Sequence, residues 1–280
     1  MQFTIQNRPA ADFATLAANR DAQILADDFD GDGNTDLALI NQGGGWTSVP
    51  IALASPTSFT IENISAPDFA GLAANPSVEA VSGDFNGDGK ADIALINRGA
   101  GWTSVPIALS GTAGFTVENL SAPDFAALAA SPDVEAVSGD FNGDGTADIA
   151  LINHALGWNT VPIALVSSTG VTIQNRPAAD FAALAASPDV TVIADDFNND
   201  GKADLALINQ AAGWTSVPVA LSDLTSFTIS NVSAPDLASL AANASVSIVA
   251  GDFNGDGVAD FGLVNQAPGW NTVPIGITAV

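Results

Sequence analysis

The sequence predicts an all-β protein: a five-bladed β-propeller of four-stranded blades joined by short connector helices. Two observations lead to this prediction. A unit of 56 residues is repeated five times over the 280 residues, and each unit holds several short apolar runs separated by turn residues. Repeats of this length that bury both sheet faces are typical of propeller blades. We therefore expect residues 1–280 to form a single domain.

The repeat is visible in two kinds of residue. Tryptophan recurs every 56 residues, at Trp46, Trp102, Trp158, Trp214 and Trp270. An acidic segment keeps the same spacing and begins at Asp28, Asp84, Asp140, Asp196 and Asp252. Because the five units follow one another without a gap, they account for the whole chain.

The second unit illustrates the expected blade. Four strands are predicted, at residues 78–83, 91–97, 102–109 and 115–119. The second of these reads ADIALIN, a nearly continuous apolar run that indicates burial on both faces. In the fourth, Phe115 and Val117 alternate with polar residues, as in a half-exposed strand. A short helix follows, for which Ser121 is the expected cap.

Proline occupies the third predicted strand of every unit, at Pro50, Pro106, Pro162, Pro218 and Pro274. Since proline has no N–H to donate to an interior ladder, we expect a β-bulge there or a position where the missing N–H faces no partner.

The two ends of the chain carry complementary parts of one blade. Residues 3–7 match the outermost strand of a unit, whereas the fifth unit ends shortly after its third strand. Pairing of residues 3–7 with residues 275–278 would complete the fifth blade, close the ring and remove an exposed sheet edge. The same strand could instead pair with a neighbouring molecule, so both a monomeric ring and a strand-swapped oligomer are open.

Composition excludes several partners. The formal net charge is −25, and such a chain repels nucleic acid and anionic lipid surfaces. The sequence has no cysteine, so neither disulfides nor thiolate metal sites form. No apolar run is long enough for a membrane helix, and residues 1–5 lack the features of a signal peptide. We expect neither nucleic-acid binding nor membrane insertion.

The acidic segments have the donor pattern of a calcium loop. They read DFDGDGNTD, DFNGDGKAD, DFNGDGTAD, DFNNDGKAD and DFNGDGVAD, with side-chain oxygens at positions 1, 3, 5 and 9. The backbone carbonyl at position 7 adds a further oxygen, and calcium prefers six to eight oxygen ligands. Glycine at position 6 permits the sharp turn. The predicted ligands are Asp28, Asp30, Asp32, Asn34 and Asp36; Asp84, Asn86, Asp88, Lys90 and Asp92; Asp140, Asn142, Asp144, Thr146 and Asp148; Asp196, Asn198, Asp200, Lys202 and Asp204; and Asp252, Asn254, Asp256, Val258 and Asp260.

Other interpretations of this loop are weaker. An EF-hand needs a glutamate at position 12, which is Leu95 in the second unit, and a helix where a strand is predicted here. Zinc lacks ligands, because His154 is the only histidine and there is no cysteine. Magnesium remains possible, and so does a metal-free turn rich in Asp and Gly. Five copies with one oxygen spacing favour about one calcium ion per blade.

The segment DFNGDGKADIALIN resembles the FG-GAP or VCBS repeats of integrin α-subunit propellers and of bacterial and fungal calcium-binding propellers, including the lectin of Psathyrella velutina. The resemblance extends over the whole chain. It implies calcium at Asp28, Asp30, Asp32, Asp36 and their equivalents. The chain departs from these relatives in number, since they typically have seven blades and this chain has five units.

The turn between the second and third strands is the best candidate for a ligand site. It reads INQGGGWTSVP in the first unit, and we expect it on the face opposite the acidic loops. Asn amides can bracket a sugar hydroxyl and an indole can stack on a pyranose ring; alternatively, the Asn caps the turn and the Trp fills space between blades. The candidate residues are Asn41, Gln42, Trp46, Asn97, Arg98, Trp102, Asn153, His154, Trp158, Asn209, Gln210, Trp214, Asn265, Gln266 and Trp270.

Three functions are compatible with these features. The first is a multivalent, lectin-like carbohydrate-binding protein that binds calcium. The second is a protein-adhesion or scaffold propeller, and the third is a designed repeat protein with no natural ligand. No enzymatic role is expected, because nothing resembles a nucleophile with a base, a phosphate loop or a redox site. Calcium loops are usually filled where free calcium is high, so we expect an extracellular location.

Overall fold

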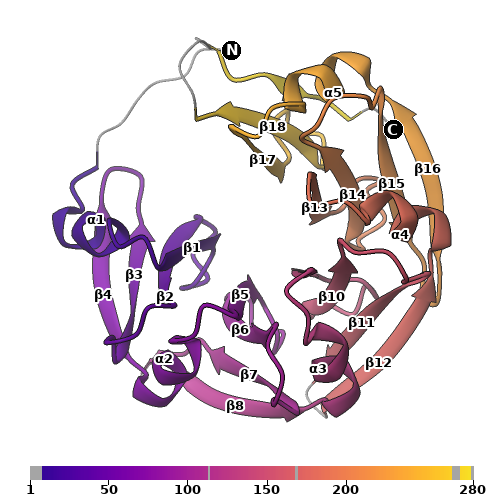
Figure 1. The fold of residues 1–280 in the computed structure, drawn as a ribbon. Coiled ribbons are helices and arrows are strands. Elements are labelled where there is room, and N and C mark those ends of the chain that lie inside the picture. Colours follow the sequence, from indigo (N-terminus) through magenta and orange to yellow (C-terminus); the bar gives the residue numbers. More distant parts are fainter. Residues whose placement is uncertain (1–7, 113, 168–169, 267–271, 279–280) are drawn as a thin grey trace. The chain divides into compact units, whose positions relative to one another are not determined.

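The computed structural model describes residues 8–112, 114–167, 170–266 and 272–278. In this part the chain forms five antiparallel sheets in sequence order, and the strands of each sheet are neighbours in chain order (Figure 1). Short turns favour this order, because antiparallel neighbours can be joined by a hairpin whereas parallel strands need a long crossover. Such sheets, repeated five times, are the blades of a β-propeller. The predicted fold class is confirmed.

The first of two compact units holds the first two sheets. The first sheet consists of β1 (Ala22–Asp27), β2 (Asp36–Asn41), β3 (Ser48–Ala54) and β4 (Phe59–Ser65). The second consists of β5 (Val78–Gly83), β6 (Asp92–Asn97), β7 (Ser104–Leu109) and β8 (Thr116–Ser121). Strands β1 and β5 lie side by side (Figure 1).

The second compact unit holds the other three sheets. The third sheet consists of β9 (Val134–Gly139), β10 (Asp148–Asn153), β11 (Thr160–Ser167) and β12 (Gly170–Pro177). The fourth consists of β13 (Val190–Asp195), β14 (Asp204–Asn209), β15 (Ser216–Ser222) and β16 (Phe227–Ser233). The fifth has β17 (Val246–Gly251), β18 (Asp260–Asn265) and β19 (Ile275–Gly276). Its predicted fourth strand, residues 3–7, lies outside the described residues, so ring closure stays a prediction.

Each unit of the repeat has one short connector helix. The helices are α1 (Ala11–Ala17), α2 (Pro67–Ala73), α3 (Pro123–Ala129), α4 (Ala179–Ala185) and α5 (Pro235–Ala241). The predicted cap of helix α3 was wrong. Ser121 ends β8, and the N-cap residue of α3 is Ala122, which makes no side-chain capping hydrogen bond. Pro123 starts the helix instead, because its fixed φ suits the first turn. No helix in the described ranges is long and apolar enough to cross a membrane.

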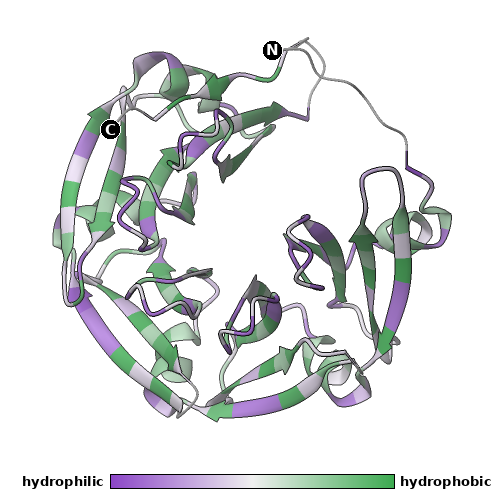
Figure 2. Ribbon diagram, turned by 180° about the vertical axis from the view of Figure 1, so that it is seen from behind, coloured by the Kyte–Doolittle hydropathy of each residue, from purple (hydrophilic) through white to green (hydrophobic). Residues whose placement is uncertain are grey.

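Within each of the two compact units, neighbouring sheets pack through their apolar faces. In the first compact unit, Ile51, Phe69 and Leu95 belong to one buried cluster. All six residues of β6 are buried, as the apolar run predicted. The outermost strand is more exposed than expected: Val117 is 37% exposed, whereas Phe115 precedes β8 and packs against the cluster. Figure 2 shows the polar segments along these outermost strands.

The structure explains the proline of the third strand. Strand β2 pairs with β3 at Leu37↔Ala52 and Ala38↔Ile51, and the pairing ends there. The next residue of β3 is Pro50, which lies opposite Asn63 of β4. The missing N–H therefore lies where the β2–β3 ladder has ended, which agrees with the second of the two expected solutions.

Candidate metal loops and the opposite turns

The acidic loops lie where the sequence placed them, between the first and the second strand of each sheet. In the first sheet, β1 ends at Asp27 and β2 begins at Asp36, so that positions 1 to 8 of the loop form the connection and position 9 opens the strand. Position 9 opens the second strand of the other four sheets as well. All loops therefore have the same attachment to their sheet.

The carboxylate at position 1 accepts hydrogen bonds from backbone N–H groups later in the same loop. Asp28 Oδ1 accepts the N–H of Gly31, and its Oδ2 accepts the N–H of Gly33, both at 2.7 Å. Gly31 and Gly33 have φ of +79° and +85°, a conformation that only glycine adopts without strain. The equivalent bonds recur in the second, third and fifth loops. The loop is thus preorganised by its own backbone.

The carboxylate at position 9 has a structural role that the spacing did not reveal. Asp36 Oδ2 accepts the N–H of Phe29 at 3.0 Å, and its Oδ1 accepts the N–H of Ala54 at 2.6 Å. The same two bonds occur in every sheet, and all five of these aspartates are 0% exposed. Each therefore ties the acidic loop to the end of the third strand.

Burial has an electrostatic consequence at position 9. Desolvation raises the pKa of Asp92, Asp148 and Asp204 to about 7, and the two N–H donors at each only partly offset it. The neighbouring carboxylates at positions 1 and 5 add to the rise. A carboxylate in this setting is stabilised in its charged form by a nearby cation.

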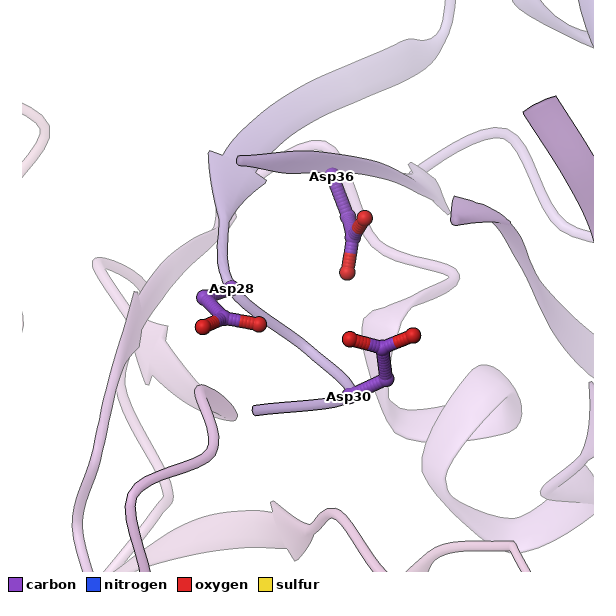
Figure 3. Close-up of side chains that lie close together, drawn as sticks. All are labelled: Asp28, Asp30 and Asp36. Atoms are coloured by element: carbon purple, nitrogen blue, oxygen red, sulfur yellow. The ribbon is translucent and has the colours of Figure 1, made fainter. Parts of the chain in front are cut away.

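Three carboxylates converge in the first loop. Oxygens of Asp28, Asp30 and Asp36 lie within 4.8 Å of one another, and Figure 3 shows the three groups pointing toward a common space. Asp32 is not part of this cluster; its Oδ1 accepts the N–H of Asn34 at 2.8 Å. Within the described residues no other loop brings three carboxylates so close, because position 3 is Asn elsewhere.

The donor set suits calcium. All side-chain donors are oxygens, and each carboxylate has about four lone-pair sites, so that the bonds to backbone N–H groups leave some free. A second observation comes from the fourth loop, where Asn198 Oδ1 is buried without a hydrogen-bond partner. A buried acceptor without a donor is costly unless a cation or another donor satisfies it. At position 7, the backbone N–H and the side chains of Asn34, Thr146 and Lys202 contact the carboxylate at position 5. Ligation by the backbone carbonyl of position 7 stays a prediction.

Neighbouring loops are joined by backbone hydrogen bonds within each of the two compact units. In the first compact unit, Ala91 N donates to Asp28 O at 2.7 Å. In the second compact unit, Ala203 N donates to Asp140 O at 2.7 Å. Since the acceptor is always position 1 and the donor position 8 of the next loop, the position of one candidate ligand depends on the following loop. Sequence reasoning missed this link.

The asparagines of the opposite turns hold those turns together. Asn41 Nδ2 donates to Gly44 O at 2.7 Å, and its Oδ1 accepts the N–H of Gly43 at 3.0 Å. Asn97, Asn153 and Asn209 accept the N–H two residues ahead in the same way. The alternative reading of these residues as turn caps therefore describes their contacts.

The residue after each of these asparagines makes a contact of its own. Gln42 Nε2 donates to Val78 O in the next sheet at 2.6 Å, and Gln210 Nε2 donates to Val246 O at 2.8 Å. Gln266 Nε2 donates to Ser247 Oγ at 2.6 Å. The equivalents Arg98 and His154 pair with Glu79 and Glu135. These side chains are therefore engaged rather than free in solvent.

The tryptophans are half-buried. Trp46, Trp102 and Trp214 pack against apolar clusters of their sheets, and Trp158 is equally half-exposed. Recesses of about 10 Å³ lie beside Trp102 and Trp158, which is room for about one water molecule. A sugar ring would thus need the exposed part of the indole. Trp270 lies outside the described residues.

One apolar groove of about 470 Å³ lies in the second unit, between the fourth and fifth sheets. Val217, Val219 and Leu221 of β15 and Phe261 of β18 line it, and it reaches Gly276 of β19. It has little polar lining of the kind that fixes a sugar.

Comparison with known proteins identifies the repeat. A family model described as FG-GAP-like repeat matches residues 28–95, 84–151 and 196–262, which together make up more than half of the chain. The chain belongs to the FG-GAP-like repeat family. Each match begins at position 1 of an acidic loop, so the matched segments include the loops.

A solved structure shares the fold. It is described as the structural basis of specific recognition of non-reducing terminal N-acetylglucosamine by an Agrocybe aegerita lectin. The TM-score is 0.65 at 19% sequence identity, and the alignment covers 92% of this FG-GAP chain but 66% of the lectin chain. At this identity the likeness shows the fold alone. No protein in the curated collection matches the chain.

Proposed function

We propose that this FG-GAP propeller binds calcium in its acidic loops and serves as a binding module, with glycans as its ligand class. The observation that supports calcium most directly is the cluster of Asp28, Asp30 and Asp36, whose oxygens lie within 4.8 Å of one another. Three like charges at this distance repel unless a cation lies among them. The 31 acidic and 6 basic residues leave few internal counterions.

In this proposal each loop supplies side-chain oxygens from positions 1, 3 and 9, with positions 5 and 7 completing the set. Calcium would add a hard cation that offsets carboxylate repulsion and joins the loop to the second strand. The chain itself orients these ligands, because backbone N–H groups donate to the carboxylates of Asp28 and Asp36. The function proposed is binding and not catalysis. An extracellular location, where free calcium is high, suits such sites.

Glycan binding is proposed from two supporting observations. The lectin that shares the fold recognises terminal N-acetylglucosamine, and the turns opposite the acidic loops present half-exposed indoles in several sheets. Repeated weak sites gain strength when a multivalent ligand engages several at once. A protein-adhesion role remains the competing proposal.

Calcium binding is tested by calorimetric unfolding and native mass spectrometry of the full chain, with calcium and with a chelator. We expect several bound calcium ions and a lower Tm in chelator, because binding to the folded state alone stabilises it. Asp30→Ala should remove one ion. An unchanged melting curve and no bound ions would refute the calcium sites.

Glycan binding is tested on a glycan array that includes terminal N-acetylglucosamine, with and without calcium. Binding of any glycan that competes with its free sugar supports the proposal. No binding in either condition, with the protein folded, would favour the adhesion role.

A further inference from the structure

The fourth loop, residues 196–204, differs from the others in its hydrogen bonds. In the other four loops, the side-chain oxygen at position 3 accepts the N–H of position 5. In the fourth loop that oxygen, Asn198 Oδ1, is buried and has no partner. Position 4 also differs, since Asn199 is the one non-glycine residue with positive φ in the described part of the chain, at 58°. The fourth loop therefore has a buried acceptor without a hydrogen-bond partner.

A lysine of the same loop points its charge at a candidate ligand. Lys202, at position 7, has its Nζ 2.9 Å from Asp200 Oδ2 at position 5. Its side chain is 20% exposed. No other lysine in the described residues forms an ion pair. The fourth loop thus places the ammonium group of its own lysine beside one of its carboxylates.

The backbone and the stem of Lys202 are held by the third loop. A Cβ added at Gly143 would lie 3.2 Å from Lys202 Cγ, so the aliphatic stem lies against this glycine. The next residue, Ala203, donates its N–H to Asp140 O at 2.7 Å. These contacts hold the backbone and the stem of Lys202 against the third loop, while its ammonium pairs with Asp200 of the fourth loop.

From these contacts we propose that Lys202 is a tethered cation that competes with calcium for the fourth loop, so that this loop fills at a higher calcium concentration than the other four. The inference rests on the proposed calcium binding. Calcium bound by Asp196, Asn198 and Asp204 would lie in the same loop as the ammonium on Asp200. Two positive charges so close repel, and the ion pair with Asp200 must weaken before calcium gains that oxygen.

The second loop offers a matched control. Lys90 also stands at position 7, and a Cβ added at Gly31 would lie 3.2 Å from its Cγ. The described residues show no ion pair between Lys90 and its loop. Replacing either lysine by Met removes one charge and keeps an unbranched apolar stem, so Lys90→Met controls for net charge and for packing on the glycine.

The test is hydrogen-exchange mass spectrometry of the full-length chain during a calcium titration, read peptide by peptide, with native mass spectrometry to count ions. In the wild type we expect residues 196–204 to become protected last. Lys202→Met should lower the calcium midpoint of this loop by up to about fivefold, the scale of one exposed ion pair. Lys202→Arg should retain the wild-type midpoint, and Lys90→Met should leave the fourth loop unchanged.

The outcomes separate the two proposals. If no ion binds and no loop becomes protected, the proposed calcium binding fails. If ions bind but residues 196–204 fill together with the other loops, or Lys202→Met leaves their midpoint in place, the role of Lys202 is refuted. Circular dichroism of each variant excludes unfolding as the cause, and Lys202→Gln replaces the Met variant where that one does not fold.

Discussion

His154 and Glu135 form a pair that joins a turn to a strand and a helix. The His154 Nε2 atom lies 2.7 Å from Glu135 Oε2, and its Nδ1 lies 3.1 Å from Ala185 O at the end of α4. Both ring nitrogens are therefore engaged. The side chain of the only histidine is therefore held between a strand and the end of a helix.

The pair makes stability depend on pH. Its hydrogen bond to Glu135 raises the pKa of His154 above 6.5, although burial opposes the rise. The stabilisation is fully present below the unfolded-state pKa and is lost as pH rises through the folded-state pKa. We expect His154→Gln, which copies Gln42 and Gln210, to reduce stability by about 0.5–1 kcal/mol near pH 6 and by less as the pH rises through the raised pKa of His154. Thermal melts of both proteins from pH 5.5 to 8.5 measure this; parallel curves would contradict it.

Substitutions of Asp148 and of Asp144 should change stability differently in the presence of a chelator. Asp148 is buried and accepts the N–H groups of Phe141 and Val166, whereas Asp144 lies in the exposed part of the loop. Asp148→Ala leaves two buried donors without acceptors, so we expect a loss of about 3 kcal/mol even in chelator. Asp144→Ala should lower the Tm in calcium and change it little in chelator. Equal effects of both variants in chelator would argue against the structural role of position 9.

Arg176 carries a charge that is buried in the second compact unit. It is 1% exposed, its guanidinium lies 5.5 Å from the Phe227 ring centroid, and its Nη2 atom has no hydrogen-bond partner in the described residues. We expect Arg176→Leu, which copies Leu120, to stay within about 1 kcal/mol of the wild type, because lost bonds are offset by relief of desolvation. Arg176→Ala should cost about 2–4 kcal/mol through the cavity it leaves. Urea unfolding of both variants tests this, and equal losses would refute it.

Trp102 tests whether an indole serves packing, ligand binding or both. It packs against the cluster that holds Leu95 and Phe69, so we expect Trp102→Ala to lower stability by about 2 kcal/mol without unfolding the chain. If the proposed glycan binding uses the indole face, the same variant should also weaken binding on the array. Lower stability with unchanged glycan binding would leave Trp102 a packing residue alone.

The sequence predicted those features that depend on spacing along the chain. The 56-residue step located the acidic loops between the first and second strands, and the apolar run of 91–97 predicted the fully buried β6. The errors were local. Ser121 failed as a helix cap because Pro123 already starts the helix, and Val117 is exposed because its strand is outermost.

Partners distant in sequence could not be read from one repeat at a time. The two oxygens of Asp36 contact Phe29 and Ala54, and the second of these lies 18 residues away. A signal was present for the turn residues, since Glu79 and Arg98, like Glu135 and His154, change together between units. Comparing pairs of positions across the five units would have found it.

The local sequence pattern was enough to specify the five repeats, their strand order and the oxygen-rich loops, because turn residues and hydrophobic periodicity act over a few neighbouring residues. Which carboxylates converge, which are consumed by backbone N–H groups and where Lys202 places its charge were settled by packing between strands and between loops. Those contacts depend on distances through space, which a repeat count does not contain.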